Sequence, residues 1–130
     1  MKTNLDGLPK QSLGDVIDRI TILSRKLFFG EEAVVNELTY LLDSIDKVNV
    51  KLTGGLLTAI IRIAQMNFEI WNRENAFRKA DVPEVFEAED IKKMMIEVRN
   101  FNSKRVEAKN EINRLTCKGF REFKIQHRSR

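Results

Sequence analysis

The chain has 130 residues, of which 42% are hydrophobic and 32% charged, and its formal net charge is +4. This length predicts one domain over residues 1–130, and this composition excludes a disordered chain. A single cysteine, Cys117, excludes an intrachain disulfide and a cysteine-based zinc site. The longest apolar stretch, 56–64, is too short to span a bilayer and residues 1–7 lack an apolar signal core, so we expect a cytoplasmic protein without membrane contact.

The first predicted helix follows an extended leader over residues 1–11. Ser12, with Asp15 three residues later, is typical of a helix N-terminus. An amphipathic stripe of leucine, isoleucine and valine continues from there to Gly30, a residue that commonly ends helices.

A second helix is predicted over residues 31–48, where apolar residues again recur every three or four positions. Residues 49–55 form a break, in which Gly54 and Gly55 predict the turn. Because this break is short, we expect the helices on either side of it to be antiparallel neighbours.

The two remaining predicted helices are longer. The third spans 56–79 and stops before Pro83, which disfavours helix in the residue before it. The fourth spans 87–116, and a basic tail over 118–130 follows. Together these elements predict an all-α fold, an antiparallel four-helix bundle with a long C-terminal helix. The ends of that long helix would protrude and pack on a second copy, which predicts a homodimer.

Polar side chains interrupt the apolar stripe of the fourth helix. Arg105 lies seven residues after Val98 and seven before Ile112, near the centre of the stripe. An arginine buried there alone would cost several kcal/mol, so it requires a partner or a ligand. The third helix has polar residues on its apolar side too, and the combined candidate ligand-binding residues are Asn67, Trp71, Glu74, Arg78, Asn102, Arg105 and Lys109.

These candidates carry three positive charges and one negative, which favours a phosphate or carboxylate ligand. An arginine would hold the anion through two hydrogen bonds, and Trp71 would stack on a ring. The alternative is a buried polar network or a dimer seam, completed by Asp15 and Asp18 of the first helix or by a second chain. Networks of this kind are more often architectural than ligand-binding.

Catalysis has little support in the sequence. The single histidine, His127, lies in the basic tail, so a serine–histidine–acid triad has no base. The carboxylates Glu84, Glu87 and Asp90 overlap in one stretch and lack the facing second pair that a magnesium site requires. We therefore expect no catalytic residue, metal or cofactor. A small helical enzyme that surrounds an anionic metabolite with arginines and lysines is the alternative.

The basic tail permits contact with nucleic acid, because Lys118, Arg121 and Lys124 alternate with two phenylalanines. A solvated terminus whose phenylalanines pack on the bundle is the favoured interpretation. Nucleic-acid binding is therefore the last of the functional alternatives.

Three stretches resemble an uncharacterised helical family of bacterial and phage-like proteins. Residues 12–23 resemble its Ser-x-Gly-Glu-Leu-Ile-Asp-Lys-x-Thr-Ile-Leu motif, residues 70–78 its Leu-Trp-x-x-Glu-Asp-x-x-Arg motif, and residues 102–113 its Asn-x-x-Arg-x-x-x-Lys-x-x-Ile-Asn motif. The chain departs from the second motif at Asn75, where the family has aspartate. Members are often encoded near sugar-transfer genes, which implies a link to phosphorylated or nucleotide-linked sugars.

From these patterns we expect a non-enzymatic binding or accessory protein. Its polar seam would hold a small anion, such as a phosphorylated sugar, or would form the dimer interface.

Overall fold

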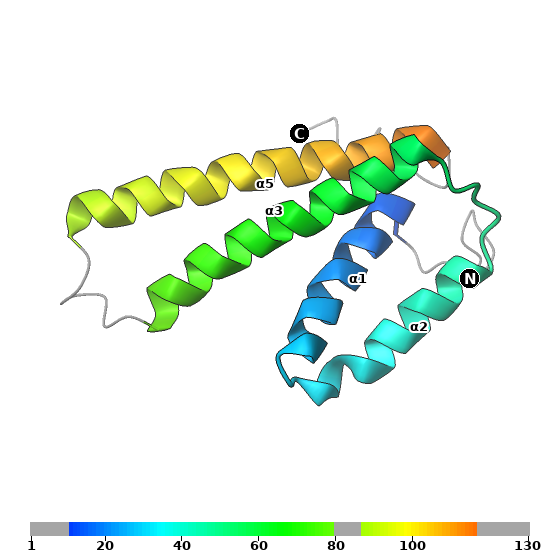
Figure 1. Cartoon of the computed structure of the whole chain (residues 1–130), viewed down its shortest axis with the longest axis horizontal. Coiled ribbons are helices and arrows are strands. Elements are labelled where there is room, and N and C mark those ends of the chain that lie inside the picture. The colour runs from blue at the N-terminus through cyan, green and yellow to red at the C-terminus, as the bar shows by residue number, and fades with distance from the viewer. Residues whose placement is uncertain (1–10, 80–86, 117–130) are drawn as a thin grey trace.

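The computed structural model describes residues 11–79 and 87–116, which contain four α-helices and one short 3-10 helix. In chain order these are α1 (Leu13–Phe28), η1 (Glu32–Val34), α2 (Val35–Asp46), α3 (Gly54–Lys79) and α5 (Ala88–Thr116) (Figure 1). The described residues contain no strand, so the predicted all-α class is confirmed. The leader, the stop at Pro83 and the basic tail lie outside the described residues.

Both predicted ends of α1 are confirmed. The Ser12 hydroxyl accepts a hydrogen bond from the backbone N–H of Asp15, which satisfies one of the free donors at the start of the helix. At the other end Gly30 adopts a φ of 96°, a left-handed conformation that glycine adopts readily. The N–H groups of Gly30 and Glu31 then bond to the carbonyls of Leu27 and Lys26, as in a Schellman motif.

The start of the second predicted helix needs a correction. Its first residues form the 3-10 helix η1, and α2 proper begins at Val35. Neither η1 nor α2 has a side-chain cap, so no side chain satisfies the free N–H groups at the start of α2.

The assignment of Gly54 and Gly55 to a turn is wrong, because both belong to the first turn of α3. The helix begins there because Thr53 caps it. The Thr53 hydroxyl accepts from the N–H of Leu56, and its carbonyl accepts from the N–H of Leu57.

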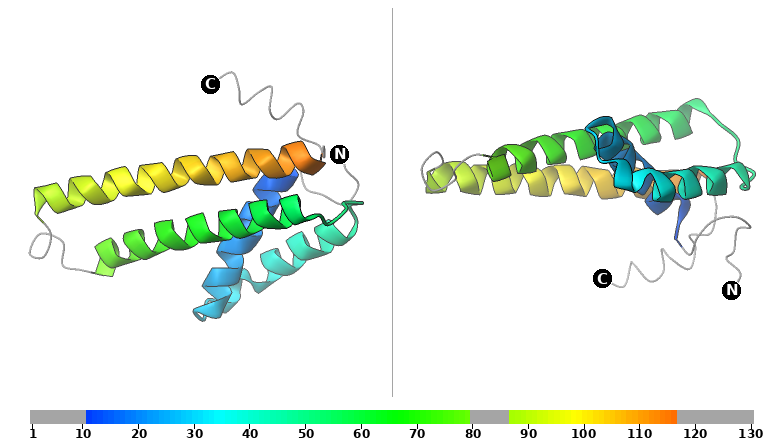
Figure 2. Two further views of the ribbon diagram at one scale, coloured as in Figure 1. Left: turned by 45° about the horizontal axis from the view of Figure 1, so that its top comes forward. Right: turned by 90° about the horizontal axis from the view of Figure 1, so that it is seen from below.

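The helices form two antiparallel pairs, α1 with α2 and α3 with α5 (Figures 1 and 2). α1 crosses α3 and α5 obliquely, starting near the C-terminal end of α5. Among the described elements, α2 comes close only to α1 and η1. The antiparallel four-helix bundle with a long C-terminal helix therefore stays a prediction; α5 itself has 29 residues. No described helix is both long and apolar enough to cross a membrane.

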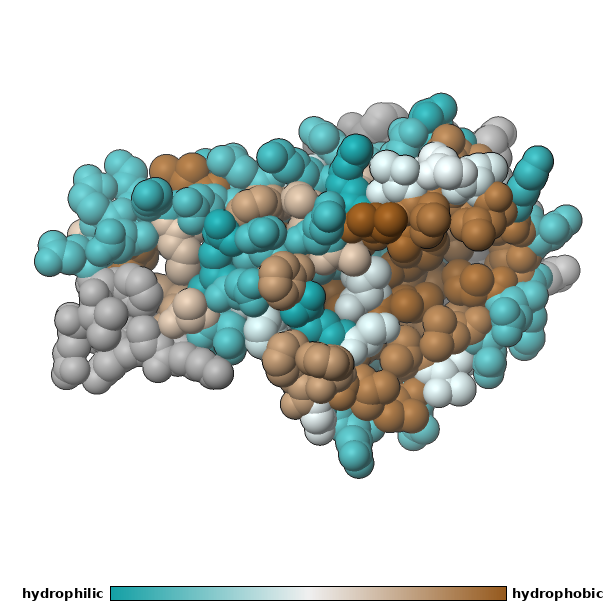
Figure 3. All heavy atoms as spheres, in the orientation of Figure 1, coloured by the Kyte–Doolittle hydropathy of each residue, from teal (hydrophilic) through white to brown (hydrophobic). Residues whose placement is uncertain are grey.

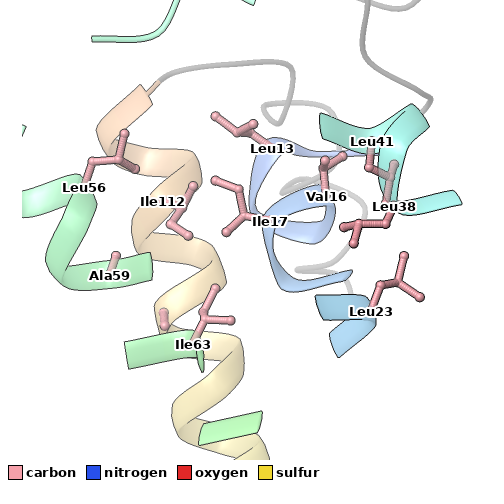
Figure 4. Packing of buried hydrophobic residues seen from close by; sticks show 11 residues of the cluster. Leu13, Val16, Ile17, Leu23, Leu38, Leu41, Leu56, Ala59, Ile63 and Ile112 are labelled. Carbon is pink, nitrogen blue, oxygen red and sulfur yellow. The ribbon is translucent and has the colours of Figure 1, made fainter. Parts of the chain in front are cut away.

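The hydrophobic core surrounds α1 (Figure 4). On one side α1 faces residues of α3 and α5, and on the other it faces α2. The buried apolar residues are Leu13, Val16, Ile17 and Leu23 of α1, Leu38 and Leu41 of α2, Leu56, Ala59 and Ile63 of α3, and Ala108 and Ile112 of α5.

Gly14 permits the close crossing of α1 and α5. A Cβ atom at this position would lie 2.5 Å from the carbonyl oxygen of Lys109 and 3.1 Å from Oδ1 of Asn113. The N–H of Gly14 donates to that same Asn113 Oδ1 at 2.7 Å, within the buried interior. Any larger residue would push the two helices apart and weaken this hydrogen bond.

Gly14→Ala is therefore expected to lower the free energy of unfolding by about 3 kcal/mol, through overpacking and a weakened buried hydrogen bond. Urea denaturation followed by circular dichroism measures the change. Gly55→Ala is the matched control, because its Cβ would lie 3.6 Å from Leu115, an ordinary contact. That control is expected to stabilise by up to about 1 kcal/mol, since alanine is the better helix former. Equal effects of the two substitutions would contradict the close crossing.

Candidate functional site

The partner that Arg105 requires is Asp18 of α1. The guanidinium donates from Nε to Oδ1 at 2.9 Å and from Nη2 to Oδ2 at 2.7 Å, a bidentate ion pair. The Asp18 side chain is only 7% exposed. Its hydrogen bonds raise the pKa of Arg105 above the ordinary value and outweigh burial, which acts in the opposite direction.

Amide side chains from the two long helices complete the surroundings of this pair. Asn67 of α3 donates from Nδ2 to Asp18 Oδ1 at 2.8 Å and to the Thr21 hydroxyl at 2.9 Å. Arg105 donates from Nη1 to Oδ1 of Asn102 at 3.1 Å. Asn67 is buried and hydrogen-bonded, so its place on the apolar side of α3 is explained by Asp18.

A second ion pair lies one turn along α5. Lys109 Nζ bonds to Oδ1 of Asp15 at 3.1 Å. With the bond from Gly14 to Asn113 described above, these contacts hold α1 against α5. We call the two ion pairs and the Gly14–Asn113 bond the α1–α5 clamp. The expectation that Asp15 and Asp18 complete the polar set is thus confirmed.

A hollow of about 620 Å³ opens beside the clamp, between the C-terminal half of α1 and the two long helices. Of the predicted residues, six line it and Lys109 does not. Trp71, Glu74 and Arg78 take no part in the hydrogen bonds of the clamp. The lining residues are Ile22, Arg25, Lys26, Phe29, Glu31, Asn67, Ile70, Trp71, Glu74, Arg78, Asn102 and Arg105.

One wall of the hollow is aromatic. The rings of Phe29 and Trp71 stack with centroids 4.9 Å apart and an interplanar angle of 18°. The Arg25 guanidinium lies 5.6 Å from the Trp71 ring and 4.2 Å from that of Phe68. These distances are typical of cation–π contacts, so part of the charge of Arg25 is balanced by aromatic faces.

The lining holds four cationic side chains and two carboxylates, those of Glu31 and Glu74. Within the part of the chain that the structure describes, Lys26 and Arg78 have neither a hydrogen bond nor an ion pair to a carboxylate, but Lys26 is near enough to Glu37 to interact with its charge. Arg105 uses three of its five N–H groups in the bonds given above, which leaves two donors. The electrostatics of the hollow therefore favour an anion.

A second hollow of about 540 Å³ adjoins the first and shares Glu74, Arg78 and Asn102 with it. Its other lining residues are mainly apolar: Phe77, Met94, Met95, Val98 and the apolar part of Arg99. The first, charged hollow and the second, mainly apolar hollow therefore meet at these three shared residues.

Six lining residues were not among the predicted candidates: Ile22, Glu31 and Ile70, and the basic and aromatic residues Arg25, Lys26 and Phe29. The last three lie at the end of α1, where basic residues are common because they complement the helix dipole. Their local sequence therefore does not distinguish them, and only the crossing of α1 over α3 brings them to the wall of the hollow.

The described residues give no support to a metal site. No group of three or more histidine, cysteine, aspartate or glutamate side chains suited to a metal occurs within 11–79 and 87–116. Asp90 accepts a bond from the Glu87 N–H at 3.4 Å at the start of α5. Glu84 and His127 lie outside the described residues.

No protein-family model, curated protein or solved structure matches the chain.

Breaking the clamp at one partner is expected to destabilise the fold strongly, because the other charge is left buried and unpaired. Asp18→Asn and Arg105→Met should each lower the free energy of unfolding by about 3 kcal/mol. The double substitution should lose less than the sum, with a coupling of about 2 kcal/mol in the cycle.

Arg19→Met is the matched control, because Arg19 also forms a bidentate pair, with Glu37, but on the exposed surface. It should cost far less, since solvent screens such pairs. Equal losses of unfolding free energy for Arg19→Met and Arg105→Met in urea denaturation would show that the buried pair stabilises the fold no more than an exposed one.

Proposed function

We propose that the hollow binds a small organic anion and that the chain acts as a non-enzymatic binding or accessory protein. The observation that carries this proposal is Arg78, a cation that lines the hollow without an ion pair to a carboxylate among the described residues. Lys26 lines it too, although Glu37 partly balances its charge. Arg105 contributes its two remaining donors to the same lining. A phosphate or carboxylate group of a ligand would accept hydrogen bonds from such cationic side chains.

Size and shape support the same proposal. A volume of about 620 Å³ falls within the range of ordinary ligand sites. The stacked rings of Phe29 and Trp71 give the lining an apolar part against which a sugar or base ring can pack. A ligand with an anionic group at Arg78 and a ring at Trp71 therefore fits the chemistry of the lining.

The clamp and the hollow divide the predicted candidates between two roles. Lys109 and Asn67 are satisfied by acids of α1, which supports an architectural role for them. Trp71, Arg78 and the free donors of Arg105 and Asn102 are assigned to the ligand. Glu74 opposes anion binding by its charge, so we assign to it contacts with hydroxyl groups of the ligand.

The resemblance to the helical family adds to the proposal. The stretches 12–23 and 102–113 meet at the clamp, and 70–78 contributes Trp71, Glu74 and Arg78 to the hollow. We propose that the chain belongs with that family as a cytoplasmic antiparallel four-helix bundle. Its ligand would then be a phosphorylated or nucleotide-linked sugar.

Thermal unfolding at constant ionic strength tests the proposal with inorganic phosphate, sugar phosphates and nucleotide sugars. A ligand that binds the native state raises the midpoint, by an amount equivalent to about 2.7 kcal/mol at a concentration 100 times its dissociation constant. The expected result is a saturable shift from at least one compound. This shift should be lost in Arg78→Met, whose own midpoint without ligand should stay close to that of the wild type, since Arg78 is exposed.

Lys93→Met is the control for charge, because Lys93 is exposed on α5 and does not line the hollow. It should keep the full ligand shift. An absent shift for every compound, or equal loss in both variants, would refute specific binding at the hollow. Turnover of a bound compound, lost in Arg78→Met, would favour the enzyme alternative.

A further inference from the structure

Helix α3 has two apolar faces, and the described residues of the chain cover one of them. Leu56, Ala59, Ile63 and Ile70 are buried within the chain. A second row, spaced by four, three and four residues, consists of Leu57, Ile61, Ala64 and Phe68. Its three large members are exposed, Ile61 to 48%. We call this row the second face of α3; its spacing is the alternation by which helices pair in coiled coils.

The second face continues into a groove beside α1. The groove has a volume of about 540 Å³, and its lining includes Ile20, Ser24, Ala64 and Phe68. Phe28, 83% exposed, and Phe29 stand at its end. Figure 3 shows hydrophobic side chains gathered in one broad area over α1, α2 and α3 on this side of the molecule.

We propose that the second face of α3 packs antiparallel against the same face of a second copy of this chain. The row follows the a and d spacing of a heptad, and about a twofold axis midway between Ala64 and Phe68 each of these positions faces its counterpart in the other copy. The two charged residues of 57–72, Arg62 and Glu69, lie on the outer side of the helix, so neither charge is buried in the seam.

The sizes of the side chains along the face are complementary in the same arrangement. About that axis, Phe68 of one copy lies opposite Ala64 of the other, and by symmetry Ala64 of the first copy lies opposite Phe68 of the second. A large side chain thereby meets a small one in two adjacent layers, which is how knobs fill holes between helices. The residues that border the face on one side, Thr58, Gln65 and Asn72, are uncharged. On the other side the Arg25 guanidinium lies 4.2 Å from the Phe68 ring, where the aromatic face partly balances its charge.

The exposed area also fits a second copy. Leu57, Ile61, Phe68, Phe28 and Phe29 each offer on the order of 100 Å² of apolar surface, which gives about 500 Å² per copy. A stable interface covers about 800 Å² per partner once its polar rim is counted. A contiguous patch of this size is at the upper end of what monomers expose.

Sedimentation equilibrium of the full chain tests the proposal. The wild type is expected to reach twice the monomer mass of 15.1 kDa with rising concentration. Ile61→Glu should weaken the dimer at least about 100-fold, because two carboxylates would be buried without partners. Its circular dichroism spectrum and thermal midpoint, measured at a concentration where both proteins are monomeric, should match the wild type, since the site is exposed in the monomer.

Val106→Glu is the matched control, because Val106 is 49% exposed but lies on α5. It should dimerise like the wild type. Oxidation of Gln65→Cys in a Cys117→Ser background should trap a disulfide-linked dimer, since residue 65 lies beside the proposed axis. Asn110→Cys, exposed on α5, should not be trapped.

Two results would overturn the proposal. The first is a wild type that is monomeric at every concentration. Dissociation by Ile96→Glu, at an exposed residue of α5, together with an intact Ile61→Glu dimer would move the interface to α5. A monomeric wild type whose thermal midpoint falls in Ile61→Glu would show that a segment of the same chain covers the face.

Discussion

The crossing of α1 over α5 is the contact on which the rest of this structure depends. It brings backbone to backbone at Gly14, where the absence of a side chain leaves room for the carbonyl of Lys109. Since α2 approaches only α1 and η1, the position of α2 follows from this crossing too. The same crossing carries the end of α1, with Lys26 and Phe29, to the wall of the hollow. A change at Gly14 would therefore disturb both the core and the candidate site.

The charges inside the crossing contribute to its register as well as to its stability. A buried ion pair gains little over a well-packed apolar pair, because desolvation offsets most of the attraction. A misplaced pair, however, costs several kcal/mol. Sliding α1 by one turn along α5 would move Asp18 from Arg105 to Lys109 and leave Arg105 without a carboxylate. The Gly14–Asn113 hydrogen bond selects the same register, so three polar contacts exclude neighbouring arrangements that the apolar residues alone would tolerate.

α3 serves different purposes along its length and around its circumference. One face belongs to the core, and the polar residues of its C-terminal half surround the hollow with α5. The remaining face, at the N-terminal half, has no cover within the described chain. Trp71 lies where these regions meet, next to Phe29 of α1. A second copy on the exposed face would therefore stand beside the aromatic wall of the hollow, which links association to the proposed ligand site by position.

The sequence by itself determined the four helices, the cap at Ser12, the end at Gly30, and the fact that Arg105 needed a partner. These features depend on residues within a few positions of one another, and helical periodicity records them directly. The sequence pattern assigned Gly54 and Gly55 to a turn, although they belong to α3. The residue that caps this helix is Thr53, which no sequence signal had singled out. Only the tertiary structure decided that Asp18 pairs with Arg105 and that Arg25 and Phe29 face Trp71. Gly14 and Asn113 are 99 positions apart, and a periodic pattern shows which side of a helix is apolar without showing which helix covers it.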